Sequence, residues 1–113
     1  MKKEWQRYKQ LMEERPEKFA DCDSLKIITD EEIVPKFEAE TGLTIGVLYE
    51  SDFHILVVDL VQEQDSYHTY ERLLQKNTGG CVIVPIYENR FVFLKQFRHA
   101  TRSEVYAFPR GFG

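Results

Sequence analysis

The stretch from Gly79 to Arg98 constrains the fold of this chain more than any other. Residues 81–87 and 90–98 are rich in β-branched and aromatic residues, and a turn at residues 88–89 separates them, which predicts two consecutive strands. Gln96 and Arg98 fall on one face of the second strand, because side chains alternate along a strand. The pair Gly79-Gly80 precedes a strand rather than a helix, so we interpret it as a flexible entry to the sheet and not as a phosphate loop.

Composition predicts one folded, intracellular protein. The chain has 113 residues, of which 42% are hydrophobic and 13% aromatic, enough for a packed core. Cys22 and Cys81 lie far apart in the sequence, which suggests neither a disulfide framework nor a zinc site. No signal core is present, and no apolar run reaches the roughly 20 residues that cross a bilayer. We therefore expect a cytoplasmic protein without a membrane partner.

Charge is unevenly distributed along the chain. The net charge is −4, which argues against a nucleic acid polymer as partner. From Asn89 to Gly113, however, the sequence has one acidic residue, Glu104, and five basic residues: Arg90, Lys95, Arg98, Arg102 and Arg110. A local positive field of this kind suits a small anionic ligand.

Two helices are predicted before residue 43, and we expect residues 1–42 to form a helical N-terminal extension. The first covers residues 4–15 and ends at Pro16, with an apolar stripe of Trp5, Tyr8, Leu11 and Met12. The second is capped by Thr29 or Asp30 and ends near Thr41, followed by Gly42. Because proline is tolerated only in the first turn, Pro35 requires this helix to start late or to be kinked.

The middle of the chain changes to strand periodicity. Residues 43–49 and 53–61 read as a hairpin, and residues 67–74 as a further strand. The strand 53–61 is apolar on both sides, so we expect it to be covered on both faces over part of its length. The predicted class is α+β, with a mostly antiparallel, mixed sheet of about five or six strands after the helices.

Three ordered pieces of the last third resemble the entry to the catalytic half of a Nudix hydrolase, most closely the ADP-ribose pyrophosphatase branch. They are the strand pair ending in Gln96-Phe97-Arg98, then Glu104, and then Phe108-Pro109-Arg110-Gly111. The resemblance implies that residues 43–113 form the N-terminal sheet portion of an α/β/α Nudix sandwich.

Enzymes of this family cleave a pyrophosphate bond in a nucleoside diphosphate linked to another moiety. Their Mg²⁺ or Mn²⁺ ions are held by glutamates of an Arg-Glu-x-x-Glu-Glu segment, which is not found in these 113 residues; the sequence ends two residues after Gly111. The resemblance therefore implies no catalytic residue and no tightly bound metal here, and we expect this chain alone to be inactive.

The same resemblance implies a set of binding residues. Arg98 and Gln96 would contact the substrate's phosphate or ribose, and the backbone carbonyl of Arg110 would be a metal ligand. His68 stands where the family often has an arginine, with Arg72 nearby. From the residues alone, Arg98 in an ordinary surface salt bridge is the competing interpretation.

The sequence is compatible with two functions of different classes, an enzyme and a binding module. The first is the N-terminal part of a Nudix pyrophosphatase acting on a small nucleotide. The alternative is a non-catalytic nucleotide-binding or dimerisation module of Nudix-like fold. In either case we expect a homodimer, because Val82, Phe91 and Phe93 would lack a cover within the chain, and exposed apolar patches favour association.

Overall fold

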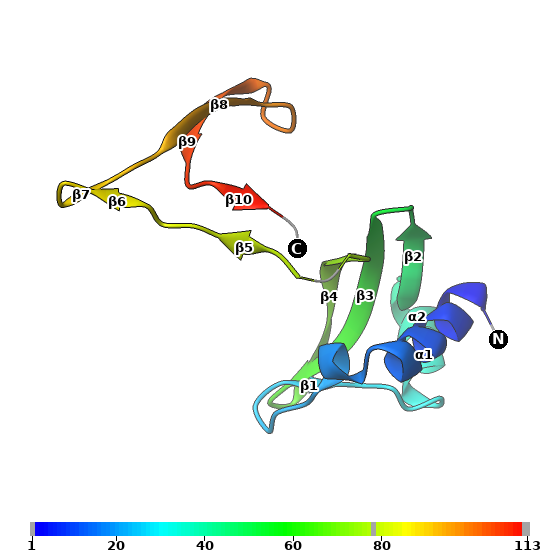
Figure 1. Ribbon diagram of the computed structural model, residues 1–113. Helices are drawn as coiled ribbons and strands as arrows, with labels where there is room; N and C mark the ends of the chain where they lie inside the picture. The colour runs from blue at the N-terminus through cyan, green and yellow to red at the C-terminus, as the bar shows by residue number, and fades with distance from the viewer. Residues whose placement is uncertain (1, 78, 112–113) are drawn as a thin grey trace. The chain divides into compact units, whose positions relative to one another are not determined.

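The computed structural model describes residues 2–77 and 79–111 and divides into two compact units, Met1–Lys76 and Asn77–Gly113 (Figure 1). Helices and antiparallel strands are both present, which confirms the α+β class. The predicted boundary between residues 42 and 43 falls inside the first unit, because the two helices there join the same hydrophobic core as the strands that follow.

Three helical elements precede the long strands of the first unit. Helix α1 (Lys3–Glu14) is followed by the short 3₁₀ helix η1 (Pro16–Phe19), and α2 covers Ile33–Thr41. Helix α2 begins late, with Glu32 and not the predicted Thr29 or Asp30 at its N-cap, so Pro35 falls in its first turn. Asp30 lies in the preceding turn, where its carboxylate accepts hydrogen bonds from the backbone N–H groups of Glu32 and Ile33. After α2 the backbone of Gly42 is left-handed, with φ 75°, as a helix-ending glycine requires.

The sheet of the first unit is centred on one long strand. It comprises β1 (Lys26–Ile27), β2 (Gly46–Glu50), β3 (His54–Glu63) and β4 (Ser66–Gln75), and all pairings are antiparallel. Strand β4 pairs with β3 along its whole length, whereas β2 and β1 pair with opposite ends of β3. The predicted hairpin of residues 43–61 is confirmed as β2 and β3, and β2 carries an irregular register between Val47 and Tyr49.

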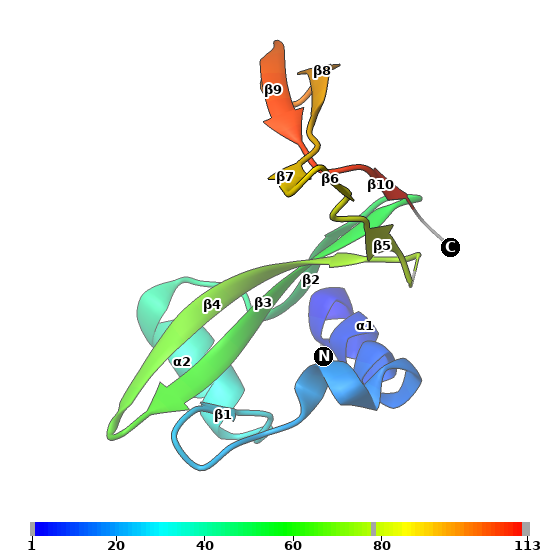
Figure 2. The ribbon, with the colours of Figure 1, turned by 60° about the vertical axis from the view of Figure 1, so that its left-hand side comes forward.

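The core of the first unit lies between these helices and strands (Figure 2). Trp5, Tyr8 and Leu11 of α1 are buried in one cluster with Val34 of α2 and with four apolar residues of β3: Ile55, Val57, Val58 and Leu60. Residues 57–61 of β3 are all buried, which confirms that both faces of this strand are covered there.

Helix α1 and strand β2 approach very closely at Gly46. Its φ is +131°, and a Cβ atom at this position would lie 2.5 Å from the backbone oxygen of Glu4. Only glycine fits such a contact without a shift of the backbone.

The second unit consists of three two-stranded antiparallel sheets. Its strands are β5 (Cys81–Val82), β6 (Ile86–Tyr87), β7 (Arg90–Phe91), β8 (Leu94–Arg98), β9 (Ser103–Ala107) and β10 (Arg110–Gly111). The pairs are β5 with β10, β6 with β7 and β8 with β9.

The second unit corrects the prediction of two unbroken strands in residues 81–98. The first is divided before β6, where Pro85 has no N–H to donate, and the second is divided at residues 92–93, between β7 and β8. The predicted sheet of five or six strands is likewise found as one four-stranded and three two-stranded sheets. Val82, Phe91 and Phe93 are 60%, 61% and 50% exposed, as the sequence predicts. Among residues 2–77 and 79–111, no helix is long and apolar enough to cross a membrane.

Candidate functional site

The β8–β9 hairpin carries two of the predicted binding residues. Gln96 and Arg98 pair with Val105 and Ser103 respectively and share one face of the hairpin. Arg98 is half-buried, and within the described part of the chain no ion pair or side-chain hydrogen bond engages it. The competing interpretation, a surface salt bridge, therefore finds no acidic partner among these residues. A guanidinium left unpaired in this way can bind an anion through two parallel hydrogen bonds.

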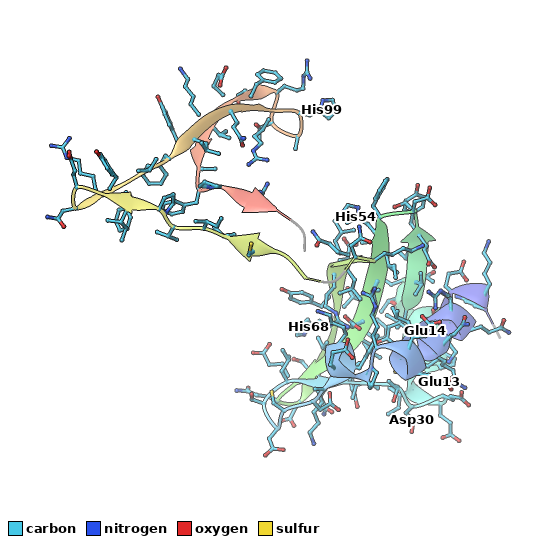
Figure 3. All side chains as sticks on the ribbon, viewed as in Figure 1. Glu13, Glu14, Asp30, His54, His68 and His99 are labelled. Atoms are coloured by element: carbon cyan, nitrogen blue, oxygen red, sulfur yellow. The ribbon has the colours of Figure 1, made fainter. Side chains whose placement is uncertain are left out.

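The turn between β8 and β9 adds further cationic character. Arg102 lies with its guanidinium 5.0 Å from the centre of the Phe97 ring and 3.0 Å from Nδ1 of His99 (Figure 3). Because Phe97 alternates with Gln96 and Arg98, this contact belongs to the opposite face of the hairpin. The side chain of Arg102 thus contacts Phe97 and His99, whereas that of Arg98 has no such partner among the described residues.

The carbonyl of Arg110 faces away from its partner strand. Arg110 pairs with Val82, and the neighbouring oxygen of Pro109 accepts a hydrogen bond of 2.8 Å from Ile83 N–H. Since backbone groups alternate in direction along an antiparallel strand, the Arg110 carbonyl is directed away from β5. It is geometrically able to accept a ligand, as the family resemblance implies for a metal.

His68, the third predicted binding residue, belongs to the first unit, whereas Gln96 and Arg98 belong to the second. It lies on β4, is half-buried and pairs with Val61 of β3 (Figure 3). Its side chain is on the same face of the sheet as Arg72, which is four residue pairs further along.

Arg72 takes part in a buried polar cluster that the sequence did not predict. Its Nε and Nη2 donate to the two oxygens of Asp59 at 2.6 and 3.1 Å, and the hydroxyl of Tyr8 donates to Oδ1 of Asp59 at 2.6 Å. A third bond, from Nη1 of Arg72 to the carbonyl of Lys18, ties η1 to the sheet, and the guanidinium lies over the ring of Phe19.

The electrostatics of this cluster are those of a structural ion pair. Burial, and then the negative charge of Asp59, raise the pKa of Tyr8 well above its ordinary value, so the hydroxyl remains a donor. Asp59 is 1% exposed and has partners on both oxygens. The sequence signal was Asp59 itself, the single charge in the apolar run Ile55–Val61.

A second charged cluster lines a surface cavity of about 260 Å³ between α1 and β2. Arg7 binds both oxygens of Glu50 at 2.9 and 3.2 Å, and Nζ of Lys76 lies 2.9 Å from Oε2. These hydrogen bonds lower the pKa of Glu50 to about 2. The charges of Arg7 and Glu50 are thus paired, whereas Lys3, the other cation of the lining, is exposed.

A metal site is not assembled by the residues described. Among residues 2–77 and 79–111, no group of three or more His, Cys, Asp or Glu side chains is placed to hold an ion. The Arg110 carbonyl alone does not make a magnesium site, because Mg²⁺ requires several oxygen ligands in octahedral geometry.

Comparisons of the chain with known protein families, with curated proteins and with solved structures give no match.

Proposed function

We propose that this chain is the N-terminal part of a Nudix hydrolase of the ADP-ribose pyrophosphatase type, and that β8 contacts its anionic substrate. The observation that carries the proposal is Arg98, a half-buried arginine without an acidic partner among the described residues, beside Gln96 on one strand face. The ordered motifs from Gln96 to Gly111 supply the reaction class, the cleavage of a pyrophosphate bond in a nucleoside diphosphate derivative.

In this proposal the chain's own residues bind and orient the substrate. Arg98 pairs with two oxygens of a phosphate through its planar guanidinium. Gln96 adds a neutral donor and acceptor on the same face. The metal of the complete enzyme would neutralise the pyrophosphate and activate water. The residues described here do not supply its ligands, so we expect the 113-residue chain to bind weakly and not to hydrolyse.

The test is a titration of ADP-ribose followed by chemical shifts in three proteins: the unmodified chain, Arg98→Ala and Arg90→Ala. Arg90 lies on β7 and controls for the loss of one positive charge in the same unit. We expect Arg98→Ala to abolish the changes in chemical shift that ADP-ribose causes in β8 residues, and Arg90→Ala to preserve these changes. The affinity of the unmodified chain should fall as salt is added. Identical changes in chemical shift in all three proteins would show that Arg98 does not bind the ligand.

A non-catalytic nucleotide-binding or dimerisation module remains the second proposal, and the lack of a carboxylate cluster in the described residues favours it. The parent reading frame distinguishes the two proposals: if it encodes an Arg-Glu-x-x-Glu-Glu segment downstream of Gly113, it supports the hydrolase. Magnesium-dependent hydrolysis of ADP-ribose by the purified 113-residue chain would contradict the expectation that this chain alone is inactive.

Both proposals include a homodimer. The exposed apolar residues of the second unit, among them Phe91 and Phe93, favour association because their burial would remove apolar surface from water. Light scattering at increasing concentration tests this: we expect a species of twice the chain mass, and a monomer at high concentration would contradict it.

A further inference from the structure

The face of the β8–β9 hairpin that carries Arg98 also carries a serine. Arg98 pairs directly with Ser103. Directly paired residues of an antiparallel ladder have their Cβ atoms about 4.5–5.5 Å apart on the same face. Ser103 is exposed and Arg98 is half-buried. A hydroxyl group therefore lies beside the guanidinium that we propose as the anion contact.

This face, which we call the Arg98 face, has no acidic side chain in β8 or β9. Glu104 pairs with Phe97 and therefore belongs to the opposite face of the hairpin. An anion on the Arg98 face meets one cation and two neutral polar side chains, and no carboxylate of these two strands repels it. The residues of the Arg98 face are Leu94, Gln96, Arg98, Ser103, Val105 and Ala107.

The hydroxyl of Ser103 can change its hydrogen-bond partner. In the structure it donates to Oγ1 of Thr101 at 3.0 Å, and both residues are exposed. A serine hydroxyl has one proton and rotates to suit its surroundings, so this proton can be redirected to a bound anion. Thr101 then loses a bond that water replaces, because its hydroxyl is at the surface.

The turn of residues 99–102 holds Ser103 and Arg98 in this pairing. The Arg102 N–H donates to the carbonyl of His99 at 3.2 Å, and the Arg102 guanidinium contacts the rings of Phe97 and His99. Arg102 has φ 52°, in the left-handed region that favours glycine. Its side-chain contacts help to keep the turn in this conformation before a ligand binds, which lowers the entropy cost of binding.

We propose that Ser103 is a specificity-determining residue of this site, because it donates its hydroxyl proton to a third oxygen of the phosphoryl group that Arg98 binds. This inference rests on the proposed binding of a nucleotide by Arg98. It narrows the ligand of Arg98 to a tetrahedral phosphoryl group, in preference to a planar carboxylate or a ribose diol.

A tetrahedral anion makes better use of these two side chains than a planar one. The guanidinium of Arg98 binds two oxygens in its own plane, which accounts for both oxygens of a carboxylate. A phosphoryl group has a further oxygen outside that plane, which a donor on the neighbouring strand can reach. A ribose diol is uncharged, so it gains less from the guanidinium than either anion does.

The test compares two anions at constant ionic strength. Sodium phosphate and sodium acetate are titrated separately, and the amide chemical shifts of β8 and β9 give the dissociation constants. The proteins are the unmodified chain, Ser103→Ala, Ser103→Thr and Tyr106→Phe. Tyr106→Phe is the matched control, because it removes one hydroxyl from the same hairpin; Tyr106 is 71% exposed and pairs with Lys95 on the opposite face.

We expect Ser103→Ala to raise the dissociation constant for phosphate about threefold or more and to leave that for acetate unchanged. Ser103→Thr keeps the hydroxyl and should retain the phosphate affinity, and Tyr106→Phe should change neither constant. Equal effects of Ser103→Ala on the two anions, no effect on phosphate, or an equal loss with Ser103→Thr would overturn the proposal. A lack of any phosphate-induced shift in β8 and β9 would overturn it as well.

The same variants titrated with ADP-ribose separate this inference from the proposed function. If ADP-ribose binding depends on Arg98 but not on Ser103, the inference is wrong and the nucleotide proposal stands. If Ser103 contributes to phosphate binding while ADP-ribose leaves the shifts of the hairpin unchanged, the nucleotide proposal is wrong and Ser103 belongs to a site for another phosphorylated ligand.

Discussion

Replacing Arg72 by methionine should strongly destabilise the first unit. Asp59 is 1% exposed, and in the intact protein its two oxygens accept two hydrogen bonds from Arg72 and one from Tyr8. The substitution leaves a buried carboxylate with a single neutral donor. Breaking a buried ion pair on one side costs about 3–5 kcal/mol, so we expect a loss of this size in the free energy of unfolding.

The double variant Asp59→Leu/Arg72→Met should cost much less than Arg72→Met alone. Removing both charges leaves only the hydroxyl of Tyr8 without its acceptor, a loss of about 1–3 kcal/mol. Adding Tyr8→Phe should recover part of that. The double-mutant cycle should therefore give a coupling between Asp59 and Arg72 of about 2 kcal/mol or more.

The assay is urea unfolding followed by the fluorescence of Trp5, the only tryptophan, which is buried in the same core cluster as Tyr8. Lys36→Met is the control, because Lys36 is exposed on α2 and should change stability by no more than about 0.5 kcal/mol. An Arg72→Met protein as stable as this control would refute the ion-pair reasoning.

Two further predictions concern the packing of α1. Since the pKa of Glu50 is lowered from 4.5 to about 2, its ion pairs stabilise the fold above about pH 4.5, and that contribution should be lost as pH falls toward 2. Glu50→Gln should flatten this part of the stability profile, and an unchanged profile would contradict the assignment. Gly46→Ala should cost about 2–3 kcal/mol by overlap with Glu4, and Gly42→Ala about 1 kcal/mol, since open space surrounds Gly42; equal losses in thermal unfolding would argue against the steric cause.

Local signals in the sequence were sufficient for most of the first unit. The apolar stripe of α1 and the left-handed Gly42 each depend on neighbours within a few residues, so pattern and propensity located them, whereas the N-cap of α2 is Glu32 and not Thr29 or Asp30. The hairpin of β2 and β3 was predicted for the same reason.

Contacts between distant residues were not predictable in this way. The sequence placed Arg72 near His68 but could not show that it meets Asp59, because that pairing depends on the register of β3 against β4. The cluster of Glu50 with Arg7 and Lys76 likewise joins β2 to α1 and to the residue that follows β4. For the candidate site, alternation alone put Gln96 and Arg98 on one face, while the unpaired state of Arg98 required the structure.

The wide sequence separation of the contacts made by α1 sets an order for folding. Tyr8 bonds to a residue 51 positions later, and Arg15 reaches the carbonyls of Gln75 and Lys76, 60 and 61 positions later. The β3–β4 hairpin needs only a local turn, whereas these contacts require closure of long loops. On the ribosome α1 is therefore synthesised before β3 and β4 but docks after them. Its apolar stripe must stay in contact with solvent or a chaperone until β4 has been synthesised.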